Sequence, residues 1–347
     1  MVRVAIVGVT GYTGAELARI LFRHPQVELT ALVAVVDEPA PLGSLVPAFR
    51  GRLEALVVNP GDIDIAETAD YCFLATPDRV AMAAVPDLLA RGVRVVDISG
   101  DFRLRDRAVY EKYYKKGPHE AAMLLGKAVY GLPEMFRDKI RGAEFVSNPG
   151  CYPTGAALAA WPLLASGEVE DDHVVVDAKT GASGAGRFPG NAFIFAETNE
   201  TLFAYGVGVH KHQPEMVQVL SDGVGRPASV LFVPHLAPMT RGILSTCYMK
   251  LRRKMSAADL HGLYEEKYKA EPFVRVLAAG QLPRTGHVKM TNFCDIGVAV
   301  HEDSSTAVVV SAIDNLIKGS AGQAAQNFNL MAGFDEDEAL GDIAPVP

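Results

Sequence analysis

The feature that most constrains this chain is a glycine-rich turn, GVTGYTG, at residues 8–14. The run before it, residues 3–9, is short, apolar and β-branched, which is typical of a buried parallel strand. The run after it, residues 11–25, has apolar residues at helical spacing and a proline just past its expected end. A strand, a glycine turn and a helix in this order predict the first unit of a nucleotide-binding α/β fold.

The three glycines of this turn have separate physical roles. Gly8 permits a tight turn, whereas Gly11 and Gly14 let the backbone approach a pyrophosphate that would lie on the helix N-terminus. The spacing is G-x-x-G-x-x-G rather than the commoner G-x-G-x-x-G, so a purely structural turn is the alternative. The flanking strand and helix favour dinucleotide binding.

Strands and helices alternate through the first part of the chain, with strand-like runs at 27–36, 70–77 and 93–104 and a helix at 80–92. This alternation predicts an α/β fold with a Rossmann-type, doubly wound parallel sheet. The pattern changes after about residue 150, where long strand-like runs surround one clear amphipathic helix at 256–272. We therefore expect a second, α+β domain with a mainly antiparallel sheet.

The expected domains are a dinucleotide-binding domain over residues 1–150 and 315–347, and a second domain over residues 151–314. The chain is expected to return to the first domain through a last helix, which is predicted over 313–334. The acidic segment DEDEALGD that follows, residues 335–342, is expected to fray.

Charge and composition narrow the classes of partner. The formal net charge of -8 argues against a nucleic-acid backbone or an anionic membrane as partner. A phosphorylated small molecule is compatible, because an anion pocket needs only one or two cations and some N–H groups. The chain starts directly with a strand, no apolar run is long enough to cross a membrane, and four cysteines lack paired spacing. These features predict a cytoplasmic, reduced protein.

One of the four cysteines differs from the rest. Three lie inside strand-like runs and are expected to be small core residues: Cys72, Cys247 and Cys294. Cys151 instead follows the turn at 148–150, and Thr154 is predicted to cap the helix after it. Cys151 would then lie just before a helix N-terminus, where the dipole favours the thiolate. From the residues alone, a nucleophile and an inert loop cysteine are equally supported.

A thiol nucleophile needs a base, which is usually a histidine held by a third group. The segment VHKHQPE places His210, His212 and Glu215 close together, although ordinary surface histidines are the alternative. His235 is a second candidate. No metal site is expected, because H-x-H lacks a third ligand and no C-x-x-C exists.

Eight motifs in order carry a resemblance that covers almost the whole chain: GVTGYTGAEL, DISGDFRL, YGLPE, SNPGCYPT, SGAGR, GVHKHQPE, PHLAPMTRGIL and AIDNLIKGSAGQAAQNFN. The chain resembles the N-acetyl-gamma-glutamyl-phosphate reductase family of the aspartate-semialdehyde dehydrogenase superfamily. That resemblance implies an arginine-biosynthesis enzyme that reduces N-acetyl-L-glutamyl 5-phosphate to N-acetyl-L-glutamate 5-semialdehyde with NADPH, releasing phosphate. It also implies that residues 151–314 form a catalytic and dimerisation domain, in a homodimer or homotetramer.

The same resemblance suggests a role for particular residues. Cys151 becomes the nucleophile and His210 the acid/base, with Glu215 as the partner of His210. Arg103 is the candidate for the leaving phosphate, with a surface ion pair as the alternative. Further substrate candidates are Asn148, Arg187 and Arg241. The expected cofactor residues are Gly8, Thr10, Gly11, Tyr12, Thr13 and Gly14 in the glycine turn, and Thr76, Pro77, Ser183, Gly184 and Asn315 on the nicotinamide side.

The chemistry is compatible with these residues. A thiolate can displace phosphate from an acyl phosphate and form a thioester, whose carbonyl then accepts a hydride. The resulting oxyanion needs N–H donors, which the helix start around Cys151 could supply, and His210 would provide the proton. Tyr152 and Pro153 match the arginine branch rather than the relative that acts on carrier-protein-bound aminoadipate.

The choice of dinucleotide stays open in the sequence. Asp37 lies near the end of the second predicted strand, where an acid favours NAD by binding the ribose hydroxyls, unless it is only a solvated loop residue. The family resemblance implies NADP.

Three rival functions explain the residues less well. A short-chain dehydrogenase needs a Tyr-x-x-x-Lys pair, which no tyrosine of the chain provides. A cysteine hydrolase leaves the glycine turn unexplained. A redox sensor that binds nucleotide would show no phosphate-dependent turnover.

Overall fold

The computed structural model describes residues 1–187, 190, 193–301, 303 and 305–346. The chain forms two compact units, and each is described by itself. The first comprises Met1–Pro149 and Ser320–Gly341, and the second comprises Gly150–Gly319 and the residues from Asp342 onward. Pro347, the predicted end of the first domain, lies outside the described residues, as do residues 302 and 304 in the predicted antiparallel strands.

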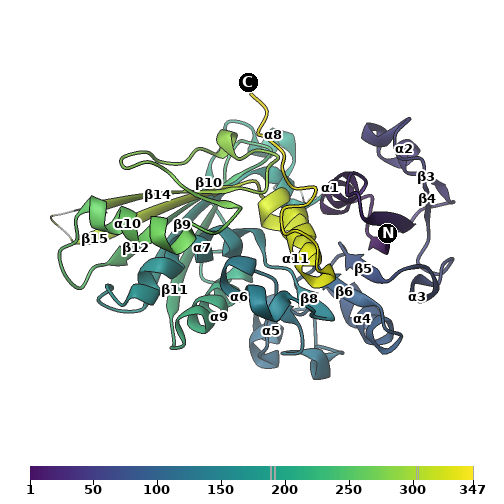
Figure 1. Ribbon diagram of the computed structural model, residues 1–347, viewed down its shortest axis with the longest axis horizontal. Coiled ribbons are helices and arrows are strands. Elements are labelled where there is room, and N and C mark those ends of the chain that lie inside the picture. The colour runs from purple at the N-terminus through teal and green to yellow at the C-terminus, as the bar shows by residue number, and fades with distance from the viewer. Residues whose placement is uncertain (188–189, 191–192, 302, 304, 347) are drawn as a thin grey trace. The chain divides into compact units, whose positions relative to one another are not determined.

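The first unit contains a sheet in the order β3-β4-β2-β1-β5-β6-β8-β7 (Figure 1). Every pairing is parallel except that of β3 with β4. The prediction of a doubly wound parallel sheet is confirmed. Its strands are β1 Val2–Val7, β2 Val27–Val33, β3 Ala40–Pro41, β4 Leu56–Val58, β5 Tyr71–Leu74, β6 Arg94–Asp97, β7 Val129–Tyr130 and β8 Phe145–Ser147.

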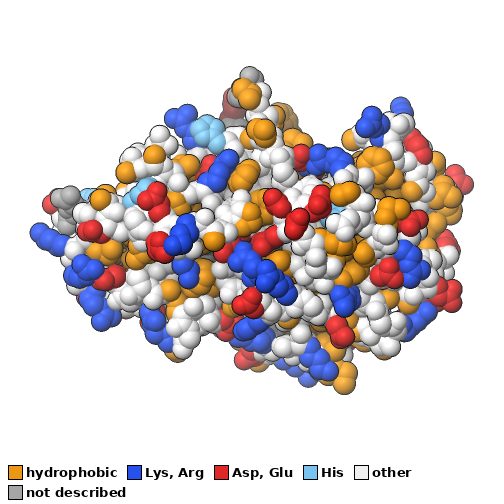
Figure 2. Space-filling model, viewed as in Figure 1, with side chains coloured by type: hydrophobic (Ala, Val, Ile, Leu, Met, Phe, Trp, Pro, Cys, Tyr) orange, Lys and Arg blue, Asp and Glu red, His pale blue; other side chains and the backbone are white. Residues whose placement is uncertain are grey.

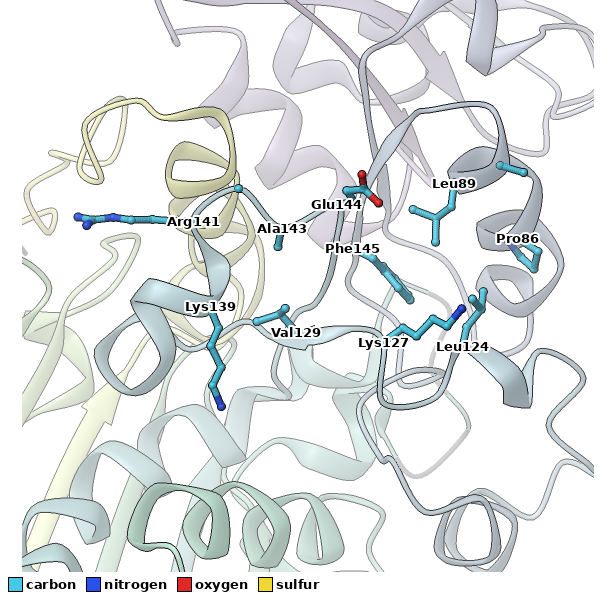
Figure 3. Close-up of a pocket in the computed structure, with 12 residues that line it drawn as sticks. Pro86, Leu89, Leu124, Lys127, Val129, Lys139, Arg141, Ala143, Glu144 and Phe145 are labelled. Atoms are coloured by element: carbon cyan, nitrogen blue, oxygen red, sulfur yellow. The ribbon is translucent and has the colours of Figure 1, made fainter.

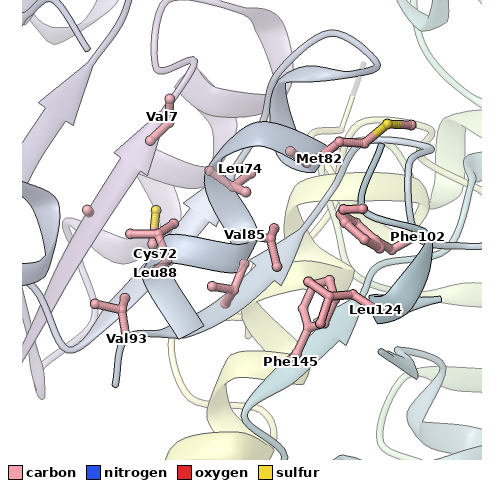
Figure 4. Packing of buried hydrophobic residues seen from close by; sticks show 14 of the residues in the cluster. Val7, Cys72, Leu74, Met82, Val85, Leu88, Val93, Phe102, Leu124 and Phe145 are labelled. Carbon is pink, nitrogen blue, oxygen red and sulfur yellow. The ribbon is translucent and has the colours of Figure 1, made fainter. Parts of the chain in front are cut away.

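Helices connect these strands and cover the sheet. They are α1 Tyr12–Leu21, α2 Leu42–Leu45, α3 Ile65–Thr68, α4 Val80–Ala90, α5 Arg107–Tyr114, α6 Pro133–Ile140 and α11 Gly322–Ala332, with 3-10 turns at Pro47–Phe49 and Ala122–Leu124. Figure 4 shows part of the core, where Val85 and Leu88 of α4 pack near Leu74 of β5 and Phe145 of β8. Strands buried on both faces explain why they read as continuous apolar runs.

The last helix and the acidic tail differ from the prediction. Strand β15 continues to Ile313, so the predicted helix over 313–334 begins later, as a π-helix at Ile317–Ala321 that leads into α11. The tail does not fray through residue 340. Glu336 forms an ion pair with Arg137 at 2.8 Å, and Leu340 is buried. Charge composition alone cannot show that a carboxylate has a fixed partner from a distant helix.

The second unit contains a sheet in the order β10-β11-β9-β12-β15-β14-β13. Most pairings are antiparallel, and β11 with β9 and β13 with β14 are parallel, so the predicted mainly antiparallel sheet is confirmed. The strands are β9 His173–Thr180, β10 Phe203–Ala204, β11 Ser229–Leu236, β12 Ile243–Lys250, β13 Val274–Val276, β14 Cys294–His301 and β15 Thr306–Ile313. The helices are α7 Cys151–Ser166, α8 Phe195–Thr198, α9 His212–Val224 and α10 Ala257–Tyr268, with 3-10 turns at Ala182–Ala185 and Thr285–His287.

Helix α7 is the centre of this unit. It is buried along almost its whole length and contacts α9, α10, β12 and β15. Two tyrosines of α10 fix it, because the Tyr264 and Tyr268 hydroxyls each donate to an α7 carbonyl at 2.6 Å. The predicted amphipathic helix is α10, which begins with a capping box on Ser256. A rigid α7 gives its N-terminus a defined position.

The surface mixes charges of both signs. On the face shown in Figure 2, basic and acidic side chains are interspersed. Across the residues that the structure describes, we find no helix that combines the length and apolar character needed to span a bilayer.

Candidate active site

The glycine turn is closely packed in the first unit. Gly8 has φ +89° and donates to the Val33 carbonyl at 2.7 Å. A Cβ on Gly8 would lie 2.2 Å from the Ala75 carbonyl oxygen, and a Cβ on Gly14 would lie 2.2 Å from that of Gly8. Helix α1 begins at Tyr12 with Gly11 as its N-cap. This cradle excludes side chains and directs the N–H groups of a helix start outward, which fits a bound pyrophosphate.

The segment after β5, which contains the predicted cofactor residues Thr76 and Pro77, starts against this turn. Ala75 donates its N–H to the Val7 carbonyl at 2.9 Å. The Thr76 hydroxyl oxygen is buried and has no hydrogen-bond partner in the described part of the chain. An orphaned hydroxyl beside a glycine cradle fits a bound group at this edge. Thr13, in the first turn of α1, lies 3.2 Å from the Ser320 hydroxyl.

Asp37 lies in an exposed loop, four residues beyond the end of β2 at Val33. The strand predicted over 27–36 is longer than the observed β2, because residues 34–36 lie beyond the end of that strand.

Arg103 is buried and is not the surface ion pair considered as the alternative. Its Nε donates to the Asn148 carbonyl and one terminal nitrogen donates to the Ile98 carbonyl, both at 2.8 Å. Asn148 is itself buried, and its amide donates to the Ser320 carbonyl and accepts from Asn327. Both residues therefore hold the chain at the end of β8.

In the second unit, Cys151 is the first residue of α7 and not a residue before it. The predicted cap at Thr154 is wrong: Gly150 is the N-cap, and the Thr154 hydroxyl donates to the Gly150 carbonyl at 3.0 Å. The helix can start early because Pro153 needs no hydrogen-bond partner in the first turn. Cys151 is partly exposed, whereas the other three cysteines are buried, as expected.

Gly319 is a functional candidate that sequence reasoning missed. It lies in the π-helix, where a Cβ would come within 2.8 Å of the Cys151 Cβ. Gly319 donates its N–H to the Asp314 carbonyl at 2.9 Å. Only glycine lets this backbone approach the cysteine, and a π-helix often marks a functional position.

His210 is held in one tautomer. The His212 N–H donates to His210 Nδ1 at 3.1 Å, so Nδ1 is an acceptor and the neutral ring carries its proton on Nε2. Burial, with a smaller effect of the Lys211 charge, lowers the pKa of His210 to about 4. The ring contacts Tyr152, Tyr205 and other aromatic rings. His210 is thus neutral at pH 7, with an N–H to donate.

Glu215 lies in the first turn of α9 and is buried. Its Oε1 accepts the N–H of Gly150 at 2.7 Å. This contact fixes the residue next to Cys151. The sequence instead predicts Glu215 as the partner of His210, and the hydrogen bond to Gly150 was not foreseen because it joins α9 to the start of α7.

Two tyrosines whose rings contact His210 were also missed. The Tyr152 and Tyr205 hydroxyls lie 3.1 Å apart. Burial raises the pKa of Tyr205 to about 12, although the hydrogen bond with Tyr152 opposes part of that increase. Burial also raises the pKa of Tyr152, so both hydroxyls stay protonated at pH 7.

A second cluster contains three more of the predicted residues of this unit: Ser183, Arg241 and Asn315. The Asn315 amide donates to the Ser183 hydroxyl at 3.0 Å and accepts from the Gly242 N–H at 2.7 Å. Arg241 pairs with Asp314 through Nε at 3.0 Å. Asp314, which sequence reasoning missed, also accepts the N–H groups of Met290, Leu316 and Ile317. It holds Arg241 and the start of the π-helix together.

Two further candidates lie outside this arrangement. Arg187 is exposed and precedes residues outside the described part of the chain. His235 lies on β11, with Nδ1 3.1 Å from an Asp177 oxygen. Within the described ranges we find no group of three His, Cys, Asp or Glu side chains that could hold a metal ion.

A hollow of about 590 Å³ in the first unit is separate from the glycine turn (Figure 3). It is lined by the end of α4 and the residues before β8, including Leu89, Leu124 and Phe145. These positions are at the amino ends of β6 and β8. The glycine turn follows the carboxyl end of β1, which is at the opposite edge of a parallel sheet.

Comparisons with known proteins define the class. Residues 3–143 match the family model described as semialdehyde dehydrogenase, NAD binding domain. Residues 151–315 match the model described as semialdehyde dehydrogenase, dimerisation domain. The fold is that of solved semialdehyde dehydrogenases: aspartate semialdehyde dehydrogenase II from Vibrio cholerae aligns with a TM-score of 0.75 at 17% identity, over 96% of this chain and 98% of that one. The Candida albicans aspartate semialdehyde dehydrogenase with NADP aligns with a TM-score of 0.65 at 14% identity, over 96% and 98%.

Sequence relatives are more specific. The chain is 48% identical to the N-acetyl-gamma-glutamyl-phosphate reductase of Geobacter sulfurreducens, over 100% of both chains. It is 45% identical to that of Desulfotalea psychrophila, over 100% of this chain and 99% of the relative. The chain therefore belongs to the N-acetyl-gamma-glutamyl-phosphate reductase family and is an oxidoreductase of amino-acid biosynthesis.

Proposed function

We propose that this enzyme uses NADPH to reduce N-acetyl-L-glutamyl 5-phosphate to N-acetyl-L-glutamate 5-semialdehyde, with release of phosphate, in arginine biosynthesis. The reaction passes through a thioester on Cys151. The observation that carries this proposal is the position of Cys151: it is the first residue of α7 and is partly exposed, whereas Cys72, Cys247 and Cys294 are buried in strands. Burial raises the pKa of Cys72 and Cys247 to about 12, so those thiols stay inert.

The thioester step needs a thiolate. The Cys151 thiol gives its proton to solvent, and the helix N-terminus stabilises the sulfur anion. Sγ then attacks the acyl carbon of the substrate, a C–S bond forms, and the C–O bond to phosphate breaks. This step needs no proton donor, because phosphate is a good leaving group.

His210 serves as a hydrogen-bond donor rather than as the base that ionises the thiol. Its Nδ1 already accepts the His212 N–H, and its Nε2 carries the proton of the neutral ring. A neutral N–H aimed at a developing oxyanion stabilises it through a hydrogen bond. When the oxyanion collapses to the aldehyde, the C–S bond breaks and the Cys151 sulfur leaves as the thiolate, so Nε2 keeps its proton. The pKa of about 4 keeps the ring neutral at pH 7 throughout. Glu215 supports this chemistry by fixing Gly150, and so the backbone of the nucleophile.

The cofactor would be held by the glycine turn and by the segment after β5. Gly8, Thr10, Gly11, Tyr12, Thr13 and Gly14 are the proposed contacts for the pyrophosphate, and Thr76, Pro77, Ser183, Gly184 and Asn315 are those for the nicotinamide. When bound, the reduced nicotinamide supplies the hydride that converts the thioester to the aldehyde level. We propose NADP as the preferred form, with NAD as the alternative if Asp37 binds the ribose.

The substrate anions need cations. Arg103 is the proposed ligand of the leaving phosphate and Arg241 that of the substrate carboxylate, with Asn148 and Arg187 as further contacts. Arg241 is held by Asp314, which fixes the guanidinium for a planar ligand. Free N-acetylglutamyl phosphate, rather than a carrier-bound substrate, is the proposed form.

We also propose a cytoplasmic homodimer or homotetramer. The four cysteines, all within the described part of the chain, are thiols and not disulfides, which fits a reducing compartment. One row of residues crosses four strands in register: Leu231, Val175, Tyr248 and Val308. Cys247, the neighbour of Tyr248, points to α7, so this row lies on the opposite face of the sheet. Leu231 is 45% and Tyr248 39% exposed, which suits an intersubunit contact.

The assembly can be tested separately. Tyr248→Glu should lower the molar mass measured by light scattering, whereas Met123→Glu, at an 80% exposed position of the first unit, should leave it unchanged. Equal masses for both variants and the wild type would place the interface elsewhere.

The reaction is best tested in reverse, because the aldehyde is easier to handle than the acyl phosphate. The protein is mixed with N-acetylglutamate semialdehyde and phosphate, and reduction of NADP or NAD is followed by absorbance. Phosphate-dependent reduction that is lost in Cys151→Ser supports the proposal, and the faster nucleotide identifies the cofactor. If the folded wild-type protein reduces neither nucleotide, the proposed reaction is contradicted. The carrier-bound substrate would then be tested next.

A further inference from the structure

The loop between β5 and α4, residues 75–79, contains a strained residue next to the glycine turn. Arg79 has φ +84° and ψ -21°. This left-handed conformation is disfavoured for any residue with a Cβ, and persists only where surrounding contacts impose it. The loop starts at Ala75, whose carbonyl oxygen would meet a Cβ on Gly8 at 2.2 Å. The strain is therefore in the segment that borders the nucleotide cradle.

A buried carboxylate imposes this conformation. The Arg79 N–H donates to both oxygens of Asp101, at 2.8 and 2.7 Å. Asp101 has no exposed surface, and its Oδ1 also accepts the Tyr110 hydroxyl at 3.1 Å. The His119 ring contacts the Asp101 carbonyl at 2.8 Å, which fixes the backbone of Asp101 as well. A charge-assisted contact of this kind is stronger than one between neutral groups.

The side chain of Arg79 is held in place as well as its backbone. Its guanidinium donates to the carbonyls of Lys116 at 2.6 Å and Pro118 at 3.3 Å, and pairs with Glu120. Lys116 in turn pairs with Asp78 at 3.0 Å. The loop is thus attached to the segment at 115–120 by two neighbouring residues.

A second observation indicates what this loop is for. The Thr76 hydroxyl oxygen, three residues before Arg79, is buried without a hydrogen-bond partner among the residues described. A buried orphan hydroxyl is costly unless something outside the chain satisfies it. The strained turn keeps that hydroxyl in place beside the glycine turn.

We propose that Asp101 and Arg79 are positioning residues for the nicotinamide nucleotide: they hold the β5–α4 loop in the one geometry in which Thr76 and Pro77 contact it. This inference rests on the cofactor assignment made above. It gives the Asp of the SGDFR segment a role distinct from that of Arg103, which holds the chain at the end of β8.

The first test compares two aspartates, Asp101 and Asp106, whose carboxylates both accept backbone N–H groups. Asp106 accepts two backbone N–H groups, those of Ala108 and Val109, at the exposed start of α5. Asn at position 101 loses the charge and offers only one acceptor oxygen to Arg79. We expect Asp101→Asn to weaken NADPH binding about tenfold, measured by nucleotide fluorescence, and to raise the nucleotide KM alike, with kcat at saturation changed less than about threefold. Asp106→Asn should change each value less than about twofold.

The second test uses the backbone directly and does not depend on a buried substitution. Arg79→Ala and Arg79→Gly both remove the guanidinium, but only glycine adopts φ +84° without strain. We expect Arg79→Gly to bind NADPH about fivefold more tightly than Arg79→Ala. If Asp101→Asn does not fold, this pair decides the question.

The outcomes separate the two proposals. A wild-type protein that binds neither NADPH nor NADH refutes the cofactor assignment itself. A wild type that binds, together with a folded Asp101→Asn of unchanged affinity or with equal affinities for the two Arg79 variants, overturns the positioning role alone.

Discussion

Two helices of this enzyme begin in nearly the same way and are used differently. The N-cap of α1 is Gly11 with φ -72° and ψ 162°, and that of α7 is Gly150 with φ -68° and ψ 153°. Because glycine has no side chain, neither N-cap residue can accept a hydrogen bond from the first N–H groups of its helix. In α1, Gly14 in the first turn packs closely on Gly8, where a Cβ would lie 2.2 Å from the Gly8 carbonyl oxygen. In α7, the first residue is Cys151, and Glu215 accepts the N–H of the cap residue.

The difference shows how one backbone device can serve two kinds of chemistry. A helix N-terminus attracts negative charge, whether that charge belongs to a ligand or to the chain. In the proposed function, the N-terminus of α1 takes an external anion, whereas the anion at α7 is the thiolate of a residue in the helix. The surrounding side chains therefore decide which use is made. The following predictions test that distinction, from the largest expected effect to the smallest.

Cys151→Ser should reduce turnover by about 10³-fold or more, because a serine hydroxyl at this helix end is not ionised at neutral pH. Nucleotide binding should stay within about twofold of the wild type, since the cradle at α1 is unchanged. Steady-state kinetics and a fluorescence titration measure the two effects. Retained turnover would remove Cys151 from the mechanism, and lost binding would mean that the two helix ends are not independent.

Gly14→Ala should abolish nucleotide binding or weaken it at least about a hundredfold, because its Cβ would lie 2.2 Å from a backbone oxygen. Gly61→Ala is the matched control, since an added Cβ there would meet no atom within 4 Å. The chemical reactivity of Cys151 toward iodoacetamide should be the same in both variants. Equal affinities for Gly61→Ala and Gly14→Ala would show that the close packing does not shape the cradle.

His210→Asn should lower turnover by about a hundredfold, and His212→Asn by less than about tenfold. The thiol pKa of Cys151, read from the pH dependence of alkylation, should be unchanged in His210→Asn if the helix end alone favours the thiolate. A thiol pKa that rises in this variant would instead identify His210 as the base. The reverse ranking of the two histidines would show that the wrong one was chosen.

The pH dependence follows from the lowered pKa of His210. The folded ring titrates at about 4 and an unfolded one at about 6.5, so the unfolded state binds more protons between these values. The contribution of His210 to stability is therefore complete above pH 6.5 and is lost as the pH falls toward 4. Urea titrations of wild type and His210→Asn should converge at low pH, and kcat should show no His210 titration between pH 6 and 8. A kcat transition near 6.5 that disappears in His210→Asn would contradict this assignment.

Glu215→Gln should have the smallest effect. The amide oxygen still accepts the Gly150 N–H, but the negative charge next to the helix end is gone, so the thiol pKa of Cys151 should fall by less than about one unit. Glu215→Ala removes the contact as well and should lower kcat further. A thiol pKa that rises in Glu215→Gln would mean that the carboxylate acts through another group, such as His210.

The sequence predicts most of this molecule where local rules apply. The apolar run before Gly8, the helical spacing after it and the Gly8, Gly11 and Gly14 series are enough to place the cradle. The contrast between strand cysteines and Cys151 also follows from neighbouring residues. The predicted helix boundary is four residues too late, at Thr154 instead of Gly150, because Thr154 resembles a cap and Pro153 resembles a helix breaker.

Contacts between distant segments were not predictable in this way. Gly319 is 168 positions from Cys151, and no local pattern shows that its missing Cβ makes room for that cysteine. Three other contacts are of the same kind. Glu215 accepts the N–H of Gly150, Glu336 in the acidic tail pairs with Arg137, and Asp101 accepts the N–H of Arg79. Each is a hydrogen bond or an ion pair whose two members are brought together only by packing.

The sequence by itself determined the class of fold and the family, and it predicts which cysteine is reactive and which histidine acts with it. These follow from periodicity, glycine spacing and ordered motifs, which are properties of neighbouring residues. Only the tertiary structure decided which nitrogen of His210 carries the proton, what Glu215 holds, and why Arg79 is strained. Hydrogen-bond direction, burial and close approach depend on atoms far apart in the chain, because folding, and not sequence order, determines which groups lose contact with water.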